Sequence, residues 1–395
     1  MESQTSTPTA RPAGRFLTPD LARGLMLAPI ALANVMIYLH ARPYGVRQHV
    51  LTDSILDQIV TGVLLSTIDA RAYPLFAALF GYGLVHMITR RRERGGSEAQ
   101  IRRTVRRRSL GLILFGAIHA ALAFSGDILG WYGLLGLAMV RLLRLSDRGL
   151  FRLALIWLLT ASLIQGVAVG GSVISTERSH FWSYAIADPL LATGWRLVEW
   201  VMTPFGLLVV LSAMLIGAWA ARHRVLEQPG LHQPLLRRVA VLGIGSGLAG
   251  GLPLALVATG VLSPGPVVLA ALSWLHVVTG VPAGLGYAAL IALVAHRLVA
   301  SGRDQHWSVR ALQATGQRSL SCYLAQSVIF AVLLPAGTLG WGAWFGPAAA
   351  AGLALTVWAL TVWGAAIWAD RPGPAETLVR HFIAGGRPAR AKIGQ

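Results

Sequence analysis

Residues 268–296 read VLAALSWLHVVTGVPAGLGYAALIALVAH, a run of 29 positions without one Asp, Glu, Lys or Arg. About 20 apolar residues are enough to cross the roughly 30 Å hydrocarbon core of a bilayer as a helix. The run shows no alternation of apolar and polar residues, so it does not predict a β-strand. It therefore predicts a membrane-spanning helix that is tilted, or kinked near Pro282.

The same pattern recurs along the chain and sets the fold class. Nine more apolar runs lie at about 24–41, 64–89, 109–125, 128–143, 150–172, 197–221, 239–260, 319–339 and 345–368. We expect an all-α, polytopic membrane helix bundle of about ten transmembrane helices, forming one membrane domain over residues 19–382. Residues 1–18 predict a disordered polar head without a cleaved signal peptide, and residues 383–395 a basic tail.

The composition separates two classes of protein. The chain has 395 residues, of which 55% are hydrophobic and 13% charged, with 34 Lys and Arg against 16 Asp and Glu and a formal net charge of +18. Soluble domains carry about 25% charged residues, so an ordinary cytosolic enzyme is excluded. The basic excess leaves a nucleic-acid binder, or a membrane protein whose basic residues are sorted to one side.

The distribution of the basic residues favours the membrane protein. With ten spans and a cytoplasmic N-terminus, 29 of the 34 Lys and Arg residues fall on the cytoplasmic side. This asymmetry follows the positive-inside rule and predicts a membrane protein with both termini in the cytoplasm. Nine of these arginines lie in residues 90–108, where anionic lipid is a better partner than RNA, so no nucleic acid is expected.

Polar residues inside the first run are functional candidates, because ionisable groups are expensive in hydrocarbon. Asp20 and Arg23 are one helical turn apart and can pair at the cytoplasmic mouth, either as a membrane anchor or as substrate-binding residues. Asn34 follows Arg23 by eleven residues, three turns on and nearly on the same face. We expect Asn34 either to bond another helix or to act in catalysis, and His40 ends the same run.

The sharpest polar constellation joins the third and fourth runs. His119 lies about two turns before the end of its helix, and Asp127 lies in the short turn that follows. A carboxylate beside an imidazole fixes its tautomer and raises its basicity, as a general base requires. The alternative is a buried histidine that bonds a backbone carbonyl, with Asp127 capping the next helix.

Further polar side chains complete the list of candidates. Substrate-binding candidates on the other runs are Arg71, Tyr132, His276, Tyr323 and Gln326. By topology Asn34, His40, His119, Asp127 and His276 belong to the outer half of the membrane, which predicts one outward-facing polar cavity. The chain has a single cysteine, Cys322, so no intramolecular disulfide and no cysteine-based metal cluster can form, and we expect no metal.

Several segments together resemble the YeiB-like family of bacterial multi-spanning membrane proteins, over about residues 15–382. They are Pro19-Asp20-Leu21-Ala22-Arg23-Gly24 with Asn34, Phe76 to Gly83, His119 with Gly126 to Leu129 and Tyr132, Gly316 to Ser327, and Arg371 to Arg380. The opening Asp-x-x-Arg-Gly helix is in turn similar to that of transmembrane acyltransferases, such as heparan glucosaminide acetyltransferase and bacterial sugar O-acyltransferases.

The acyltransferase resemblance implies roles for particular residues. The eleventh residue after the arginine is a catalytic-site Asn or His in those enzymes, and here it is Asn34. The acetyltransferase has its catalytic histidine eleven residues further on, where this chain has Gly45, with His40 and His49 nearby. His119 and Asp127 therefore compete with His40 for the catalytic role.

These two resemblances imply an acyltransferase in the bacterial inner membrane. Acyl-CoA, for example acetyl-CoA, would bind from the cytosol with its phosphates against the basic face that includes Arg23. A hydroxyl or amine acceptor would lose its proton to His119 or His40, while Asn34 stabilises the charged carbonyl oxygen. The alternative is a transporter or exporter of a small molecule, although runs 1–5 and 6–10 show no internal repeat. The lipid bilayer is the expected partner, and a homodimer stays open.

Overall fold

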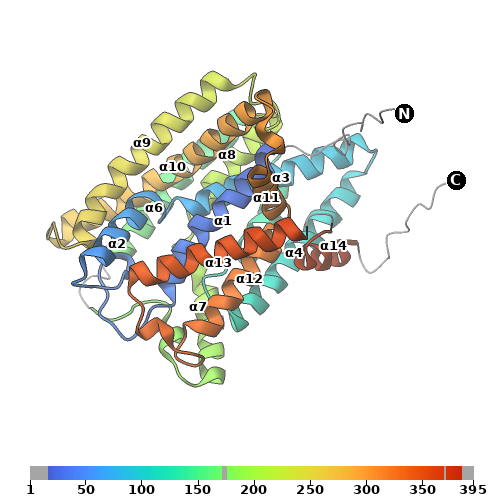
Figure 1. Ribbon diagram of the computed structural model, residues 1–395. Helices are drawn as coiled ribbons and strands as arrows, with labels where there is room; N and C mark the ends of the chain where they lie inside the picture. The colour runs from blue at the N-terminus through green and yellow to red at the C-terminus, as the bar shows by residue number, and fades with distance from the viewer. Residues whose placement is uncertain (1–16, 171–175, 369–370, 385–395) are drawn as a thin grey trace, which may run out of the picture.

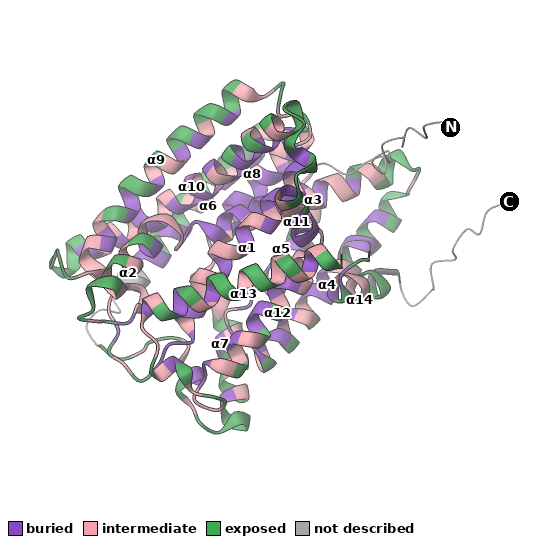
Figure 2. Cartoon of the chain, viewed as in Figure 1, coloured by how far each residue is buried: buried purple, intermediate pink, exposed green. Residues whose placement is uncertain are grey.

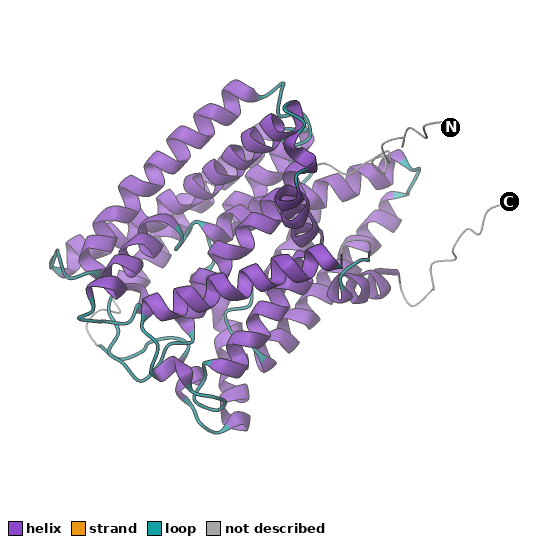
Figure 3. Ribbon diagram, in the orientation of Figure 1, coloured by secondary structure: helices purple, strands orange, loops and turns teal. Residues whose placement is uncertain are grey.

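The computed structural model describes residues 17–170, 176–368 and 371–384, and all regular elements in these ranges are helices (Figure 3). The all-α fold class is therefore confirmed. Most of the expected polar head and basic tail lies outside the described residues, while Leu17 and Thr18 already belong to the first helix.

The chain order of the helices is the same as that of the apolar runs (Figure 1). The α-helices are α1 (Leu17–Ile37), α2 (Ile55–Thr67), α3 (Ala72–Glu93), α4 (Glu98–Leu122), α5 (Leu129–Leu142), α6 (Asp147–Gly170), α7 (Pro189–Gly206), α8 (Val210–Arg222), α9 (Gln233–Ala258), α10 (Pro266–Ala300), α11 (Trp307–Gln317), α12 (Ser319–Leu333), α13 (Pro347–Ile367) and α14 (Pro374–Ala384). Short 3₁₀ helices lie between them, including η1 (Val46–Gln48), η3 (Trp182–Ala185), η4 (Arg303–Gln305) and η5 (Trp341–Ala343).

Each of the ten apolar runs falls on a helix or on a pair of helices. Within the described residues, six helical stretches are long and apolar enough to cross a membrane, or seven if α7 and α8 form one span bent by 62°. The predicted runs 128–143 and 319–339 correspond to the shorter helices α5 and α12. Run 109–125 shares α4 with an arginine-rich first half. The chain is a helical membrane protein, whereas the count of ten spans stays a prediction.

Large apolar side chains on the outer surface fit this assignment. Val241 and Leu242 on α9 are 72% and 71% exposed, and Trp363 on α13 is 66% exposed. Buried residues concentrate between the helices, while the outward faces of α9 and α13 are exposed (Figure 2). Lipid chains would cover such side chains in a bilayer, where burial against another protein element is not needed.

The loops assigned to the cytoplasmic side by charge meet at one end of the molecule. Arg222 at the end of α8 donates to the Leu145 carbonyl between α5 and α6 at 3.0 Å. Arg224 lies 3.8 Å from Glu93 at the end of α3. We call the end of the molecule where Arg222 and Arg224 make these contacts the basic end. Its orientation in the cell stays a prediction.

Basic residues assigned to the other side meet at the opposite end. Arg42 Nη2 donates to the Trp344 carbonyl at 2.8 Å, and Arg178 Nη1 donates to the Leu39 carbonyl just after α1 at 2.8 Å. These bonds tie together loops that are more than a hundred residues apart in sequence. Each of these contacts joins loops that the charge sorting assigns to the same side, and the sidedness itself stays a prediction.

Glycines allow the central helices to pack backbone against backbone. A Cβ atom at Gly217 on α8 would lie 2.0 Å from the Ala78 carbonyl oxygen on α3, and one at Gly81 would lie 2.1 Å from the Met214 oxygen. Small residues at such crossings are typical of helix packing in membranes, since close approach increases van der Waals contact. The α3–α8 crossing supports one wall of the site described below.

We predict that Gly217→Ala lowers the free energy of unfolding by about 1–3 kcal/mol, because the methyl group must push α3 and α8 apart. The measurement is the thermal unfolding of the detergent-solubilised full-length protein. Gly245→Ala on α9 is the matched control, because nothing lies within 4 Å of its Cβ position. It should leave stability unchanged or raise it slightly, since alanine favours a helix. Equal losses for both variants would contradict this interpretation of the crossing.

Candidate functional site

A cavity of about 600 Å³ opens among α1, α3, α4, α5, α12 and α14. Its charged wall carries five arginines against two carboxylates, namely Arg23, Arg108, Arg318, Arg371 and Arg380 with Asp20 and Glu376. Its apolar wall is formed by Ile30, Phe76, Leu79, Phe80, Leu112, Ile128, Leu129 and Val379, with Tyr132 and Tyr323 beside them. The cavity therefore fits a ligand with an anionic group and an apolar or neutral arm.

Two of the charged groups hold the wall of the cavity together. Arg318 Nη1 donates to the Ala314 carbonyl at 2.9 Å, and its Nη2 donates to the Trp368 carbonyl at 2.7 Å. The Glu376 carboxylate on α14 accepts from the Leu320 amide at 2.9 Å, at the start of α12. A carboxylate at a helix N-terminus is stabilised by the unpaired amides there. These contacts seat α14 against α12.

The pair at the start of α1 forms as its spacing predicts. Arg23 Nη1 lies 3.3 Å from Asp20 Oδ1, and both residues line the cavity. The Arg23 side chain is 30% exposed, which is enough to reach a ligand. The pair can thus serve both as an anchor and as part of the cavity wall.

His119 and Asp127 lie in direct contact. The Nδ1 atom of His119, in the last turn of α4, is 2.9 Å from Asp127 Oδ1, and the two side chains are 3% and 0% exposed. The second carboxylate oxygen accepts from the Gly130 amide at 2.9 Å. Asp127 therefore accepts from the first turn of α5, as expected of a capping residue, and also contacts the imidazole, while the role of the pair as a general base stays a prediction.

The second nitrogen of this imidazole is available. His119 Nε2 is buried and has no hydrogen-bond partner among the described residues. In the tautomer that donates from Nδ1 to the Asp127 carboxylate, the Nε2 atom of His119 carries a lone pair. This is the state in which a histidine can take a proton from a substrate.

His119 lies just behind the cavity wall. Its ring centroid is 5.1 Å from that of Tyr323, which lines the cavity, and Asp127 precedes the lining residue Ile128. On its other side Asp127 borders a smaller, mainly apolar pocket of about 140 Å³ beside Trp131 and Trp200. The His119–Asp127 pair thus lies close to two hollows.

Asn34 and His40 have different surroundings. Asn34 is half-buried one helical turn beyond the lining residue Ile30, and no hydrogen bond of its side chain occurs within the described residues. His40 follows the end of α1, and its Nε2 lies 3.1 Å from the Leu334 carbonyl oxygen. Burial lowers the pKa of His40, which keeps it neutral. The structure places His40 in a loop contact and Asn34 in line with the cavity.

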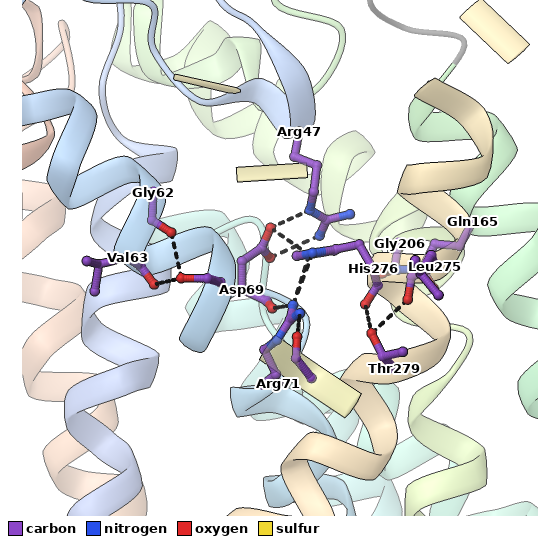
Figure 4. A network of polar contacts seen from close by, with 12 residues as sticks. Arg47, Gly62, Val63, Asp69, Arg71, Gln165, Gly206, Leu275, His276 and Thr279 are labelled. Atoms are coloured by element: carbon purple, nitrogen blue, oxygen red, sulfur yellow. Dashed lines mark hydrogen bonds and ion pairs between the residues drawn. The ribbon is translucent and has the colours of Figure 1, made fainter. Parts of the chain in front are cut away.

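Arg71 and His276 belong to a second polar cluster, drawn in Figure 4. Arg71 is 0% exposed, its Nη1 lies 3.1 Å from the His276 ring nitrogens, and its Nη2 donates to the Gly247 carbonyl at 2.7 Å. Asp69 binds Arg47 through both carboxylate oxygens and lies 3.5 Å from His276 Nε2. This cluster fixes the break between α2 and α3 against α9 and α10.

The expectation that these residues line one outward-facing cavity is therefore wrong. Of the five outer-half candidates, only Asp127 lines either described pocket, and His276 is enclosed by the Arg71 cluster. Tyr132 and Tyr323 do line the larger cavity, whereas Gln326 donates to Thr361 Oγ1 on α13 at 3.2 Å. Hydropathy orders residues by depth but does not tell which helices are neighbours.

Sequence reasoning missed several wall residues. Arg108 counted only as the last arginine of a basic loop, and Arg318 and Glu376 as parts of a family motif, yet all three line the cavity. A usable signal existed for Arg108, because His119 follows it by eleven residues, the same spacing as between Arg23 and Asn34. No three His, Cys, Asp or Glu side chains converge as a metal site within the part of the chain that is described.

The fold and the cavity together define a helical membrane protein with an arginine-lined pocket. Sequence comparison identifies its relatives. Residues 220–386 match the family described as "Protein of unknown function (DUF418)". The uncharacterized protein YxaH of Bacillus subtilis is 24% identical over 262 residues, which is 58% of this chain and 63% of YxaH. The uncharacterized protein YeiB of Escherichia coli is 30% identical over 199 residues, which is 46% of this chain and 45% of YeiB.

These comparisons confirm the resemblance to the YeiB-like proteins. Each match spans less than two thirds of the relative's own length, and no solved structure matches the chain. The DUF418 match includes Arg318, Tyr323 and Glu376 of the cavity wall, while His119 and Asp127 precede it. The similarity to acyltransferases stays a prediction.

We predict that Asp69→Asn lowers the free energy of unfolding by about 2–4 kcal/mol. The change leaves Arg47 without the carboxylate that it binds, a loss worth about 3–5 kcal/mol when both partners are fully buried. We reduce the figure because the Asp69 side chain is 21% exposed. The measurement is thermal unfolding in detergent.

A double variant and a surface control complete this experiment. Adding Arg47→Gln to Asp69→Asn should recover part of the stability, since the cation that lost its carboxylate is removed. Glu98→Gln breaks the exposed pair with Arg92, in which the side chains are 56% and 58% exposed, and should leave unfolding unchanged. If Asp69→Asn behaves like Glu98→Gln, the cluster does not stabilise the fold.

Proposed function

We propose that this protein is a membrane-embedded acyltransferase in which His119 is the general base. The observation that carries the proposal is the 2.9 Å contact between His119 Nδ1 and Asp127, which leaves the buried Nε2 without a partner among the described residues. A buried polar atom that lacks a hydrogen bond costs free energy, and such atoms are therefore candidates for substrate contact.

In this mechanism His119 moves one proton twice. Its Nε2 takes the proton of a hydroxyl or amine acceptor as the acceptor oxygen or nitrogen bonds to the thioester carbonyl carbon. The tetrahedral intermediate then breaks its carbon–sulfur bond, and the leaving thiolate receives the proton from the imidazolium. Asp127 stabilises that imidazolium in between.

Asn34 would stabilise the oxygen of the tetrahedral intermediate. Its side-chain amide can donate to the oxygen as negative charge develops there, and such a donor is worth about 10²–10³ in rate in other acyl-transfer enzymes. The support from this chain is that Asn34 lies one turn beyond Ile30, which lines the cavity. For the reaction, the Tyr323 ring must turn away from His119.

The donor would be an acyl-CoA, such as acetyl-CoA, that enters at the basic end. The five arginines of the cavity wall support an anionic donor, and Arg23 lies among them. If the basic end faces the cytoplasm of a bacterial inner membrane, the donor comes from the cytosol. The acceptor would then reach His119 from the opposite side, where the smaller pocket borders Asp127.

We predict that His119→Ala and Asn34→Ala each abolish acyl transfer and leave expression and folding intact. Asn34 makes no side-chain hydrogen bond within the described residues, and after His119→Ala the Asp127 carboxylate still accepts from the Gly130 amide. The measurement is CoA release from acetyl-CoA, or from longer acyl-CoAs, by the purified protein with hydroxyl and amine acceptors. His306→Ala, at an exposed position before α11, is the control and should retain activity.

Two further variants separate the competing interpretations. If His40 were the base, His40→Ala would be inactive and His119→Ala would be active. In that case His40 would have to leave its contact with the Leu334 carbonyl and bind the acceptor. A His119→Ala/Asn34→Ala double variant that still transfers acyl groups would overturn the proposal. Solute flux in proteoliposomes without CoA release would favour the transporter.

A further inference from the structure

Arg108 makes a cation–π contact with Phe80 inside the cavity. Its guanidinium carbon lies 4.8 Å from the centroid of the Phe80 ring, and that ring packs against Tyr132 at 5.0 Å. Stacking on an aromatic face fixes the plane of a guanidinium but leaves its N–H groups free at the edge. The edge of Arg108 is thus ready for a planar, bidentate acceptor.

Arg108 has no carboxylate partner among the described residues. The two acids of the cavity wall are engaged elsewhere, because Asp20 pairs with Arg23 and Glu376 accepts from the amide of Leu320. Arg23 and Arg108 line the same cavity, so their like charges repel each other. Two partly buried cations that repel each other are stabilised when an anion binds between them.

Arg23 and Arg108 lie along one face of α3. A Cβ atom at Gly83 would lie 3.5 Å from Arg23 Nη2, and Phe80, which carries Arg108, is three residues earlier on the same face. At 3.5 Å such a Cβ would be in ordinary van der Waals contact, so the Arg23 guanidinium lies directly against α3 at Gly83. The two cations therefore approach the cavity from α1 and α4 at neighbouring turns of α3.

The same two helices carry the proposed reacting groups at the same spacing from the arginines. Asn34 follows Arg23 on α1 by eleven residues, and His119 follows Arg108 on α4 by eleven. Both helices start at the basic end, and eleven residues are three turns, or about 16 Å. On each helix the arginine and the polar residue thus share a face.

We infer that Arg23 and Arg108 form a phosphate subsite. A ligand whose phosphate binds there needs an arm of about 16 Å to reach the level of His119 and Asn34. An extended phosphopantetheine arm has a comparable length, which is why a thioester at its tip would reach His119. The reacting end of this inference rests on the proposed function. The phosphate subsite stands on the cavity alone.

The test compares two ligands that differ only in the phosphate. Full-length protein in uncharged detergent is titrated by calorimetry with 4′-phosphopantetheine and with pantetheine. We expect the wild type to bind the phosphorylated arm at least roughly ten-fold more tightly, because the two arginines make charge-assisted hydrogen bonds. Arg108→Gln should bring the two affinities within about twofold, since one arm of the clamp is lost.

The controls separate a built subsite from general attraction. Arg103→Gln removes the same charge from an exposed position on α4 and should keep the preference for phosphate. Arg108→Lys keeps the charge without the planar fork and should lie between the wild type and Arg108→Gln. Equal losses in Arg103→Gln and Arg108→Gln would overturn the inference, as would a phosphate preference that persists in Arg108→Gln.

The source of the phosphate is a separate arm of the same experiment. Acetyl-CoA and phosphatidylglycerol vesicles are each tested as competitors of bound phosphopantetheine. Phosphatidylcholine vesicles and a fatty acid serve as controls. Competition by acetyl-CoA assigns the subsite to a soluble donor, and competition by phosphatidylglycerol alone assigns it to a lipid headgroup; both support a phosphate subsite. Competition by the fatty acid that depends equally on Arg108, or no binding of any phosphate probe, overturns it.

The outcome is distinguishable from that of the proposed function. Binding is measured without turnover, so Arg108-dependent phosphate binding with a fully active His119→Ala variant would remove the acyltransferase mechanism and leave the subsite. Acyl transfer that needs His119, together with phosphate binding that does not need Arg108, would keep the acyltransferase mechanism and remove the subsite.

Discussion

A polar atom inside hydrocarbon has no water to bind, and this constraint governs the whole structure. Backbone amides and carbonyls meet it within the helices, so the described chain is helical throughout its spans. Side chains must meet it across helices. Arg71 does so by donating to the Gly247 carbonyl and contacting His276, and Gln326 does so by donating to Thr361. Atoms that do not meet it, such as His119 Nε2, are therefore informative.

Small residues make these contacts geometrically attainable. A Cβ at Gly251 would lie 2.3 Å from Arg71 Nη2, and one at Gly116 would lie 2.4 Å from Asp127 Oδ2. Both glycines leave the space that a buried charged side chain occupies. The bundle thus uses glycine both to bring helices together and to seat its few buried charges. The stability of the fold and the geometry of the site depend on the same crossings.

The fold was largely predictable and the site only in part. Ten apolar runs and the sorted arginines indicate an all-α membrane protein, because each signal comes from one segment and its solvent. The Asp20–Arg23 pair and the His119–Asp127 contact follow from spacings of three and eight residues. In contrast, Arg108 over Phe80 and Glu376 at the start of α12 join distant segments. Their partners could not be chosen without knowing which helices are neighbours.

The sequence by itself determined that the chain is helical, that its helices are lipid-facing, and which loops gather at the basic end. These properties depend on local hydropathy and on charge counted loop by loop. Only the tertiary structure decided that His276 joins Asp69 and Arg71, that His40 bonds a loop carbonyl, and that Arg23 and Arg108 share a cavity. The physical reason is that apolar helix faces are nearly interchangeable in lipid, so neighbours are selected by close packing and polar pairing across the chain.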